Sequence, residues 1–472
     1  MDHEGIISAC LEAYKRTFKN GSLFTGVVQV AQYEDSKWDF LPESNLPQDI
    51  VSVSQDSVFK SLAPICKLMS RSLMLLAELR SQAVWVLMGQ VAKTLDGISI
   101  KVEHSWSSSA LSMISDEDTL AATIRPTTQQ LWNVFKTLLF SAVLIFQSII
   151  DVIILQNSPH STISSLPSSG GLASEILGSL FHLSFISSKF GGLTAEGGGF
   201  TEQKRTFFAA LDILSGDSSA SEALLGSLVS NSDGSSEAVR RSRAAFFLAC
   251  AEQLIPVVGD HIIESSILPF AKTFLDDPSH RETFESAHSV LLAVFSNNGN
   301  RIRGSMHYGP DRRETLALRL TPFYLASLLN NSTEGRLSTE QLRLAFHSVV
   351  RSTSASGDDA AAWLCIGALL NALNLAKGQP NAAAQLHRLR LTLISLISAV
   401  NLPLLGRLFI EVDKEIMASE ESQEKQESNM QGELIEEVHN EVMSRVGDAQ
   451  KQVSLEWWLN LRERLGAALP EL

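Results

Sequence analysis

Apolar residues recur at helical spacing in one segment after another of this chain, and stretches rich in serine and glycine separate these segments. The clearest case is residues 337–354, LSTEQLRLAFHSVVRSTS, in which Leu342, Phe346, Val349 and Val350 fall at positions i, i+4, i+7 and i+8. That spacing places the four side chains on one face of an α-helix. We therefore expect helices of about three to five turns that bury such faces against one another.

The helical segments follow no fixed repeat length, so the pattern does not support a regular ankyrin or tetratricopeptide array. We predict an all-α protein, an irregular stacked helical superhelix of the armadillo or HEAT kind, with no sheet beyond a stray hairpin near Phe24–Gln32. The composition agrees, because 22 phenylalanines, only 4 tyrosines and abundant leucine, serine and alanine suit helices better than sheets.

The charge and the cysteines limit the classes of function. The chain has 472 residues and a formal net charge of −14, which makes nucleic acid an unfavourable partner because phosphate backbones need a basic surface. The four cysteines are isolated in sequence and form no CxxC pair. That spacing argues against a zinc site or a disulfide framework.

Three regions are expected. Residues 1–410 form the helical-stack domain, residues 411–450 an acidic, disordered linker with a partial helix, and residues 451–472 a C-terminal helix with two tryptophans. Within the stack, Ser/Gly-rich sequences predict loops near 157–171, 191–199 and 215–237, because such stretches bury little apolar surface.

A polar stripe runs along the helix of residues 337–354. Ser338 and Gln341 have the spacing of a capping box at its start. Arg343, His347 and Arg351 recur every four residues, so we expect them on a solvated face away from the apolar stripe, with His347 mostly neutral between two cations. These three residues are candidate contacts for an acidic partner.

The acidic stretch and the tail hold the other candidate contacts. Residues 411–441 contain eleven acidic residues against two lysines, which accounts for nine of the fourteen net negative charges. Such a run is usually a solvated linker, and the alternative is an interaction tail that uses Glu420, Glu421 and Glu424. Trp457 and Trp458 begin the last helix, which must dock on its own body or on a partner.

One apolar segment, residues 131–155, has two interpretations. Residues 137–150 are uncharged, but that run is shorter than the roughly 20 residues that a bilayer core requires. Lys136 and Asp151 flank it, and Gln147 lies inside it. We expect a buried central helix and keep a membrane-spanning helix as the alternative.

Motifs of catalysis are scarce. In FGGLTAEGGGF, residues 190–200, the spaced glycines lack the Lys-Ser/Thr of a phosphate loop, and the zinc-protease, nucleophile-elbow, EF-hand and dinucleotide-binding signatures are missing from the sequence. His288 lies on an apolar stripe with Phe284 and Leu291, so we expect a core histidine whose ring nitrogens bond backbone groups. We therefore expect no enzyme, no catalytic residue, no cofactor and no metal.

Several sequence blocks resemble the fungal peroxin 8 family of peroxisome biogenesis proteins. They appear in the family's order from about Ile124 to Thr353, with an echo at Trp457-Trp458: TTQQLWNVFKTLLFSAVLIFQSI, LFHLSFISSKFG, FAALDILS, FESAHSVLLAVFS, LTPFYLASLL and LSTEQLRLAFHSVVRSTS. FESAHS and LSTEQLRLAF are the more specific blocks. The resemblance implies a non-enzymatic scaffold, peripheral on the lumenal face of the peroxisomal membrane. It would bridge the docking and RING-finger subcomplexes of matrix-protein import and contact the cargo receptor.

The C-terminus departs from the family. Members often end in a Ser-Lys-Leu type import signal, but this chain ends Pro470-Glu471-Leu472, in which an anion replaces the cation. A cytosolic location therefore stays open. The rivals to the import scaffold are a cytosolic helical adaptor unrelated to peroxisomes and a membrane protein anchored by residues 131–155.

Overall fold

The computed structural model describes residues 2–23, 30–32, 37–41, 44–114, 116–156, 166–193, 198–230, 236–304, 315–379, 382–418 and 425–466. Side chains are described for most of these residues, with the exceptions of 32, 117, 299–304 and 425–429. The chain forms two compact units, residues 1–270 and 271–472.

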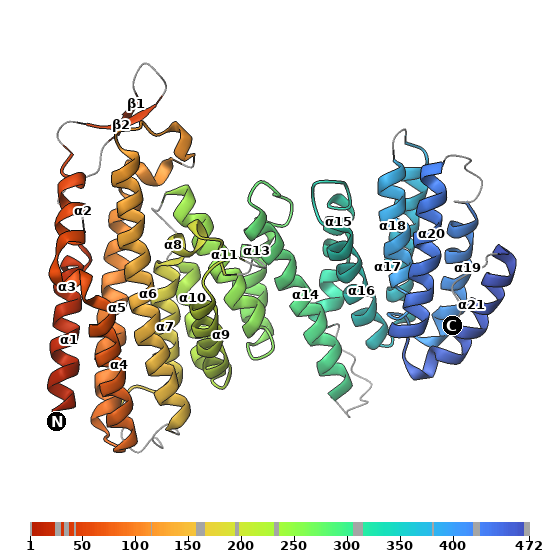
Figure 1. The fold of residues 1–472 in the computed structure, drawn as a ribbon. Helices are drawn as coiled ribbons and strands as arrows, with labels where there is room; N and C mark the ends of the chain where they lie inside the picture. The colour runs from red at the N-terminus through yellow and green to blue at the C-terminus, as the bar shows by residue number, and fades with distance from the viewer. Residues whose placement is uncertain are drawn as a thin grey trace. The chain divides into compact units, whose positions relative to one another are not determined.

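The first unit contains a series of helices and one small hairpin (Figure 1). Its elements are α1 (His3–Thr17), η1 (Lys19–Gly21), β1 (Val30–Gln32), β2 (Trp38–Phe40), α2 (Leu46–Gln55), α3 (Ser57–Lys60), α4 (Leu62–Glu78), α5 (Ala83–Ser107), η2 (Ala110–Met113), η3 (Glu117–Thr119), α6 (Arg125–Leu155), α7 (Ser169–His182), α8 (Ser184–Lys189), α9 (Thr201–Ser215), α10 (Ser218–Ser230), α11 (Glu237–Leu254), α12 (Asp260–Ile262) and η4 (Ile263–Ile267), followed by α13 (Leu268–Lys272) at the unit boundary.

The second unit is helical throughout the part that the structure describes. Its elements are α14 (Arg281–Gly304), α15 (Leu316–Asn330), α16 (Thr339–Ala355), α17 (Asp359–Lys377), α18 (Ala383–Ser395), α19 (Leu402–Ala418), α20 (Lys425–Asn440), η5 (Glu441–Arg445) and α21 (Asp448–Leu465).

The prediction of an all-α stack is confirmed. Within the described residues, the sheet is confined to the antiparallel pair β1–β2, in which Val30 faces Phe40 and Gln32 faces Trp38. The expected hairpin near Phe24–Gln32 thus overlaps β1, while its residues 24–29 lie outside the described part. Neighbouring helices of the first unit run side by side, with α4 against α6 and α5 against α7 (Figure 1).

The apolar segment 131–155 lies within α6, a core helix of the first unit. It packs against α2, α4 and α9, and Leu131, Leu139, Phe146 and Ile150 are fully buried. By length and composition alone, α6 and α17 could each cross a membrane, but 67% of the apolar window of α6 is buried inside the protein. The core position accounts for the apolar run without a bilayer.

One expected loop is a helix. The serine-rich sequence around 215–237 contains α10, whose Leu224, Leu225 and Leu228 are buried. These leucines lie one and four positions apart, which places them on one helical face. Ser221 is also fully buried, and its hydroxyl donates to the carbonyl oxygen of Leu214 at 3.0 Å. The prediction was wrong because high serine content masked this short apolar face.

His288 is a core histidine, as the sequence indicated. It is 4% exposed, and its Nε2 lies 3.2 Å from the carbonyl oxygen of Leu275. A carbonyl only accepts, so Nε2 carries the proton and Nδ1 accepts from the Tyr324 hydroxyl at 3.1 Å. Burial lowers the pKa of His288 to about 4, although the bond to Leu275 and the charge of Asp276 act in the opposite direction.

Candidate partner-contact site

The helix that carries the predicted polar stripe begins where the sequence indicated. The Ser338 hydroxyl accepts from the Gln341 amide at 3.1 Å, and the Ser338 amide donates to the Gln341 side chain at 2.9 Å, which completes the capping box of α16. Leu342, Phe346 and Val349 are fully buried, so the predicted apolar stripe is confirmed. The capping box thus sets the residue at which α16 begins.

Arg343, the first member of the stripe, is buried rather than solvated. It is 6% exposed, and one guanidinium nitrogen donates to Glu340 at 3.0 Å while another donates to Glu437 of α20. The expected solvated face is therefore wrong at this position. The reason is that α20 packs over α18 beside it and supplies a counterion that the spacing within α16 could not reveal.

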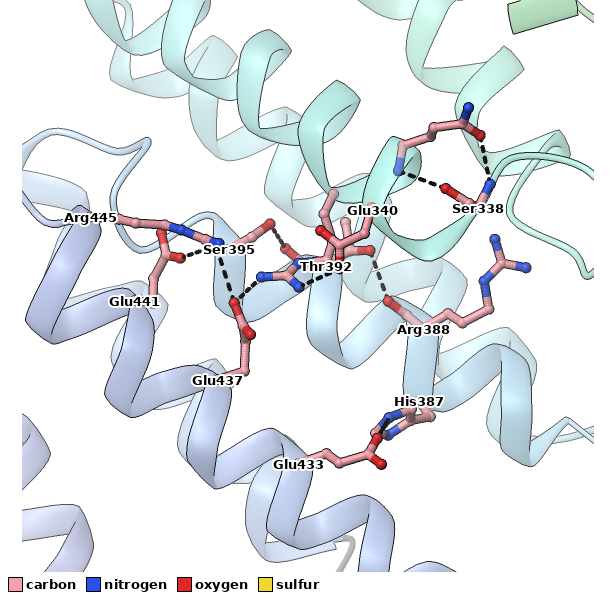
Figure 2. Close-up of polar contacts among 12 residues, drawn as sticks. Ser338, Glu340, His387, Arg388, Thr392, Ser395, Glu433, Glu437, Glu441 and Arg445 are labelled. Carbon is pink, nitrogen blue, oxygen red and sulfur yellow. Dashed lines mark hydrogen bonds and ion pairs between the residues drawn. The ribbon is translucent and has the colours of Figure 1, made fainter. Parts of the chain in front are cut away.

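Glu437 joins Arg343 to a longer polar network. Arg445 of η5 donates to Glu437 at 3.1 Å and to Glu441 at 3.0 Å, and Glu441 is fully buried (Figure 2). The Ser398 hydroxyl donates to Glu441, so its oxygen accepts from His347, whose Nε2 lies 3.2 Å away. Two arginines and two glutamates neutralise one another, which is the condition under which buried charges are tolerated.

His347 and Arg351 differ in environment. His347 is half-buried, and its pKa falls to about 4 because of burial first, and then because of the nearby Arg351 and Arg445. Its predicted neutrality agrees with this pKa, but its predicted solvation is wrong. Arg351 is exposed and is the member of the stripe that stays available to a partner.

The expected acidic linker at 411–450 contains packed helices instead. Glu415 of α19 is buried and accepts from Lys377 at 2.6 Å and from Arg390 at 3.3 Å, so it ties α19 to α17 and α18. Glu433 bonds His387 at 2.9 Å. The linker prediction was wrong because the sequence shows the density of like charge and conceals the cations that face it from other helices.

Candidate contacts within the acidic stretch are reduced to a few residues. Glu436 is exposed on α20. The proposed contacts Glu420, Glu421 and Glu424 lie outside the described residues. Most of the described carboxylates between 411 and 441 are engaged inside the second unit, so the described part of the stretch is not a free acidic tail.

The paired tryptophans dock on their own unit. Trp458 is buried, and Trp457 stacks on Phe409 with ring centroids 4.0 Å apart and planes 4° apart. Trp457 also donates its indole N–H to Asp413 at 3.1 Å, and Arg464 of the same helix pairs with Asp413 at 2.6 Å. Of the two alternatives, docking on the chain's own body is the one found.

A signal for the network was present in the sequence. Glu433, Glu437, Glu441 and Arg445 recur every four residues, as the stripe of α16 does. Two complementary stripes of period four indicate helices that face each other through charge. The expectation of a run of like charge overlooked this second stripe and so missed the pairing of the two.

Sequence reasoning also missed a buried ion cluster in the first unit. Glu103 of α5 is almost wholly buried and lies 2.6 Å from the Nδ1 atom of His182 on α7. It also receives a bidentate pair from Arg243 of α11. The three residues are separated by 79 and 140 positions, so no local pattern could have indicated the cluster.

These arrangements hold helices together and present no reactive centre. In both networks the arginines donate to carboxylates, and the contacts described there contain neither an activated nucleophile nor a paired acid and base. In the ranges that the structure describes, no group of three or more histidine, cysteine or carboxylate side chains is arranged to hold a metal ion.

Comparisons with known proteins agree with this architecture. The family model of the PEX8 helical domain matches residues 45–202, and that of the PEX8 central TPR-like domain matches residues 221–296. Peroxisomal biogenesis factor 8 of Pichia angusta is 25% identical over 169 residues, which cover 35% of this chain and 25% of that protein. Peroxisomal membrane protein PEX17 of Yarrowia lipolytica is 28% identical over 203 residues, which cover 39% of this chain and 27% of that protein. The matched part thus spans about a quarter of the length of both relatives.

Among solved structures, Kap121p bound to Pho4p is similar with a TM-score of 0.39 and 11% identity, over 90% of this chain and 48% of that one. The fold and the polar networks define an all-α protein of stacked helices whose buried charges serve helix packing. Within that class, the chain belongs to the PEX8 family, as its sequence blocks indicated.

Proposed function

We propose that this chain is a non-enzymatic scaffold of peroxisomal matrix-protein import. The observation that carries the proposal is the match of two PEX8 domain models, in chain order, across residues 45–202 and 221–296. The two curated relatives, a peroxisomal biogenesis factor and a peroxisomal membrane protein, support a role in peroxisome biogenesis.

The proposed scaffold bridges the docking and RING-finger subcomplexes at the lumenal face of the peroxisomal membrane and contacts the cargo receptor. Stacked helices support such a role because they offer extended surface to more than one partner. The exposed Arg351 is the proposed contact in the second half of the chain, and the acidic residues Glu420, Glu421 and Glu424 are the alternative contacts. The net charge of −14 favours protein partners over nucleic acid.

Location and co-purification test the proposal together. The protein is tagged at its N-terminus so that Leu472 stays free, and it is expressed in cells whose peroxisomes carry a fluorescent marker. The expected result is a peroxisomal signal and co-purification of docking and RING-finger peroxins. A diffuse cytosolic signal without peroxins would favour the unrelated helical adaptor.

Alkaline carbonate extraction tests the mode of membrane association. Because α6 is a core helix, we expect a peripheral protein, which the extraction releases into the supernatant. A protein that stays in the pellet, like an integral control, would favour an anchor at residues 131–155.

A further inference from the structure

The glycine-rich loop sequence 190–200 begins and ends with a phenylalanine, and the structure describes its residues 190–193 and 198–200. The Gly199 amide donates to the carbonyl oxygen of Phe190 at 3.1 Å, so the two ends of the loop are held together. Gly191 and Gly199 have φ angles of 104° and 74°, a region that favours glycine. A Cβ atom on Gly199 would lie 2.1 Å from the carbonyl oxygen of Gly192, so no larger residue fits without moving the backbone.

This close approach of Gly199 to Phe190 places aromatic rings around one lysine, Lys136. The ring centroids of Phe190 and Phe200 are 5.4 Å apart, and that of Phe140, on α6, lies 4.6 Å from that of Phe200. The Nζ atom of Lys136 lies 5.8, 5.3 and 5.4 Å from the ring centroids of Phe140, Phe190 and Phe200. An ammonium group at these distances from three rings is attracted by their π-faces.

The rings are anchored in the core and reach the surface. Trp132 contacts Phe190 at 6.2 Å between centroids and the buried Phe135 at 5.5 Å. At the outer end, Phe140 is 38% exposed. Aromatic side chains that are already ordered lose little conformational entropy on binding, which is a property of interface hot spots.

The same surface carries positive charge in a chain that is acidic overall. The Nζ atom of Lys189 lies 5.6 Å from the ring centroid of Trp132, and Lys189 is exposed. In the first turns of α9, Lys204 and Arg205 outnumber the single acidic residue Glu202. We define the aromatic–lysine surface as Trp132, Lys136, Phe140, Lys189, Phe190 and Phe200.

We propose that the aromatic–lysine surface binds an acidic segment of a partner protein that also carries an aromatic side chain. Lys136 would pair with one of its carboxylates, and Phe140 would pack against its ring. A protein segment fits better than a membrane because Phe190, Phe200 and Trp132 are half-buried against one another and do not protrude. The biological meaning of the inference rests on the scaffold function proposed above, whereas the binding experiment does not involve peroxisomes.

The full chain is titrated against three fluorescent synthetic peptides. The first is rich in glutamate and contains one tryptophan and one phenylalanine, the second has serine in place of both aromatic residues, and the third has lysine in place of every glutamate. We expect the first peptide to bind and each of the others to bind at least about tenfold more weakly. Equal binding of the lysine peptide, or no binding of the first peptide, would overturn the proposal.

Variants locate the binding. Phe140→Ser and Lys136→Glu should each weaken binding of the first peptide by about tenfold. The matched controls Phe208→Ser, at an exposed phenylalanine of the same unit, and Lys67→Glu, at an exposed lysine, should bind like the unmodified chain. If the controls lose as much affinity as the test variants, the peptide binds elsewhere and the proposal fails.

The loop provides an independent check. Gly199→Ala should weaken binding because its Cβ atom would collide with the Gly192 carbonyl oxygen and move Phe200 away from Phe190. Gly226→Ala should not weaken binding, since a Cβ atom there meets nothing within 4 Å. Circular dichroism of both variants shows whether the helices are retained. Unchanged affinity in folded Gly199→Ala would contradict the role given to the loop.

The last experiment measures binding of the chain to anionic vesicles of phosphatidylserine and phosphatidylcholine. Binding to vesicles that Phe140→Ser abolishes, together with no peptide binding, would assign the surface to lipid and overturn the proposal. Failure of the peptide experiment alongside normal co-purification with peroxins would leave the scaffold function intact and remove only this surface.

Discussion

Arg343 of α16, which is buried, and Glu437 of α20, which is half-buried, form an ion pair although 94 positions separate them in the chain. Arg445 shares the same carboxylate, so Glu437 lies between two guanidinium groups. The pair connects α20 to α16 and so holds this part of the acidic stretch against the rest of the second unit.

Breaking this pair should destabilise the second unit. Loss of a buried partner typically costs about 3–5 kcal/mol in free energy of unfolding. Arg343→Ala leaves the half-buried Glu437 with Arg445 as its remaining cation, so we expect a loss near the lower end of that range. The exposed Arg351→Ala is the control and should change stability by less than about 0.5 kcal/mol. Urea unfolding followed by circular dichroism measures both.

A double variant distinguishes lost charge pairing from lost packing. Arg343→Met combined with Glu437→Leu removes both charges, and apolar replacement of a buried pair is often neutral. We expect the double variant to be more stable than Arg343→Ala. The charge explanation would be contradicted if the double variant lost more free energy of unfolding than its two single variants lose together.

Phe346 tests the packing of α16. It is fully buried, so Phe346→Ala should lower the free energy of unfolding by about 3–5 kcal/mol through lost transfer energy and a cavity. Leu344→Ala, on the exposed face of the same helix, is the matched control and should have a small effect. A loss below about 1 kcal/mol at Phe346 would show that the site collapses or is solvated.

His288 should make stability depend on pH. Its pKa is lowered to about 4 from 6.5, so the unfolded chain binds a proton that the folded chain does not between these values. The contribution of His288 to the free energy of unfolding is therefore fully present above pH 6.5. It falls by roughly 3 kcal/mol as the pH drops toward 4.

The variant His288→Gln isolates this effect from that of the carboxylates. Between pH 7 and pH 4 its free energy of unfolding should fall by roughly 3 kcal/mol less than that of the unmodified chain. His104→Gln, at an exposed histidine of the first unit, is the matched control for the substitution itself. Equal slopes for the unmodified chain and His288→Gln would refute the assignment.

The four acidic residues Glu420, Glu421, Glu424 and Glu427 test the remaining part of the acidic stretch. As runs of like charge are usually solvated, we expect their change to Gln to leave the rate of association with the cargo receptor unchanged. Association rates at low and moderate salt measure this. A slower rate that high salt reproduces in the unmodified chain would identify a contact with a basic partner.

The sequence alone determined the all-α fold class and several details of its helices, although it missed α10 and the packed helices of the acidic stretch. The start of α16 at Ser338, its buried stripe and the core position of His288 follow from residues within a few turns of one another. Such features are set by helical period and capping groups, which act over short distances along the chain. Membership of the PEX8 family was readable in the same local blocks.

Tertiary structure decided which charges are buried and that Phe190 and Phe200 lie against each other. Arg343 looked solvated because its partner comes from α20, and the acidic stretch looked like a linker because its cations lie on α16, α17, α18 and η5. The closure that sets Phe190 against Phe200 depends on backbone conformations at three glycines and on the position of α6. Local periodicity shows which side chains share a face, but the group opposite that face is chosen only when the helices pack.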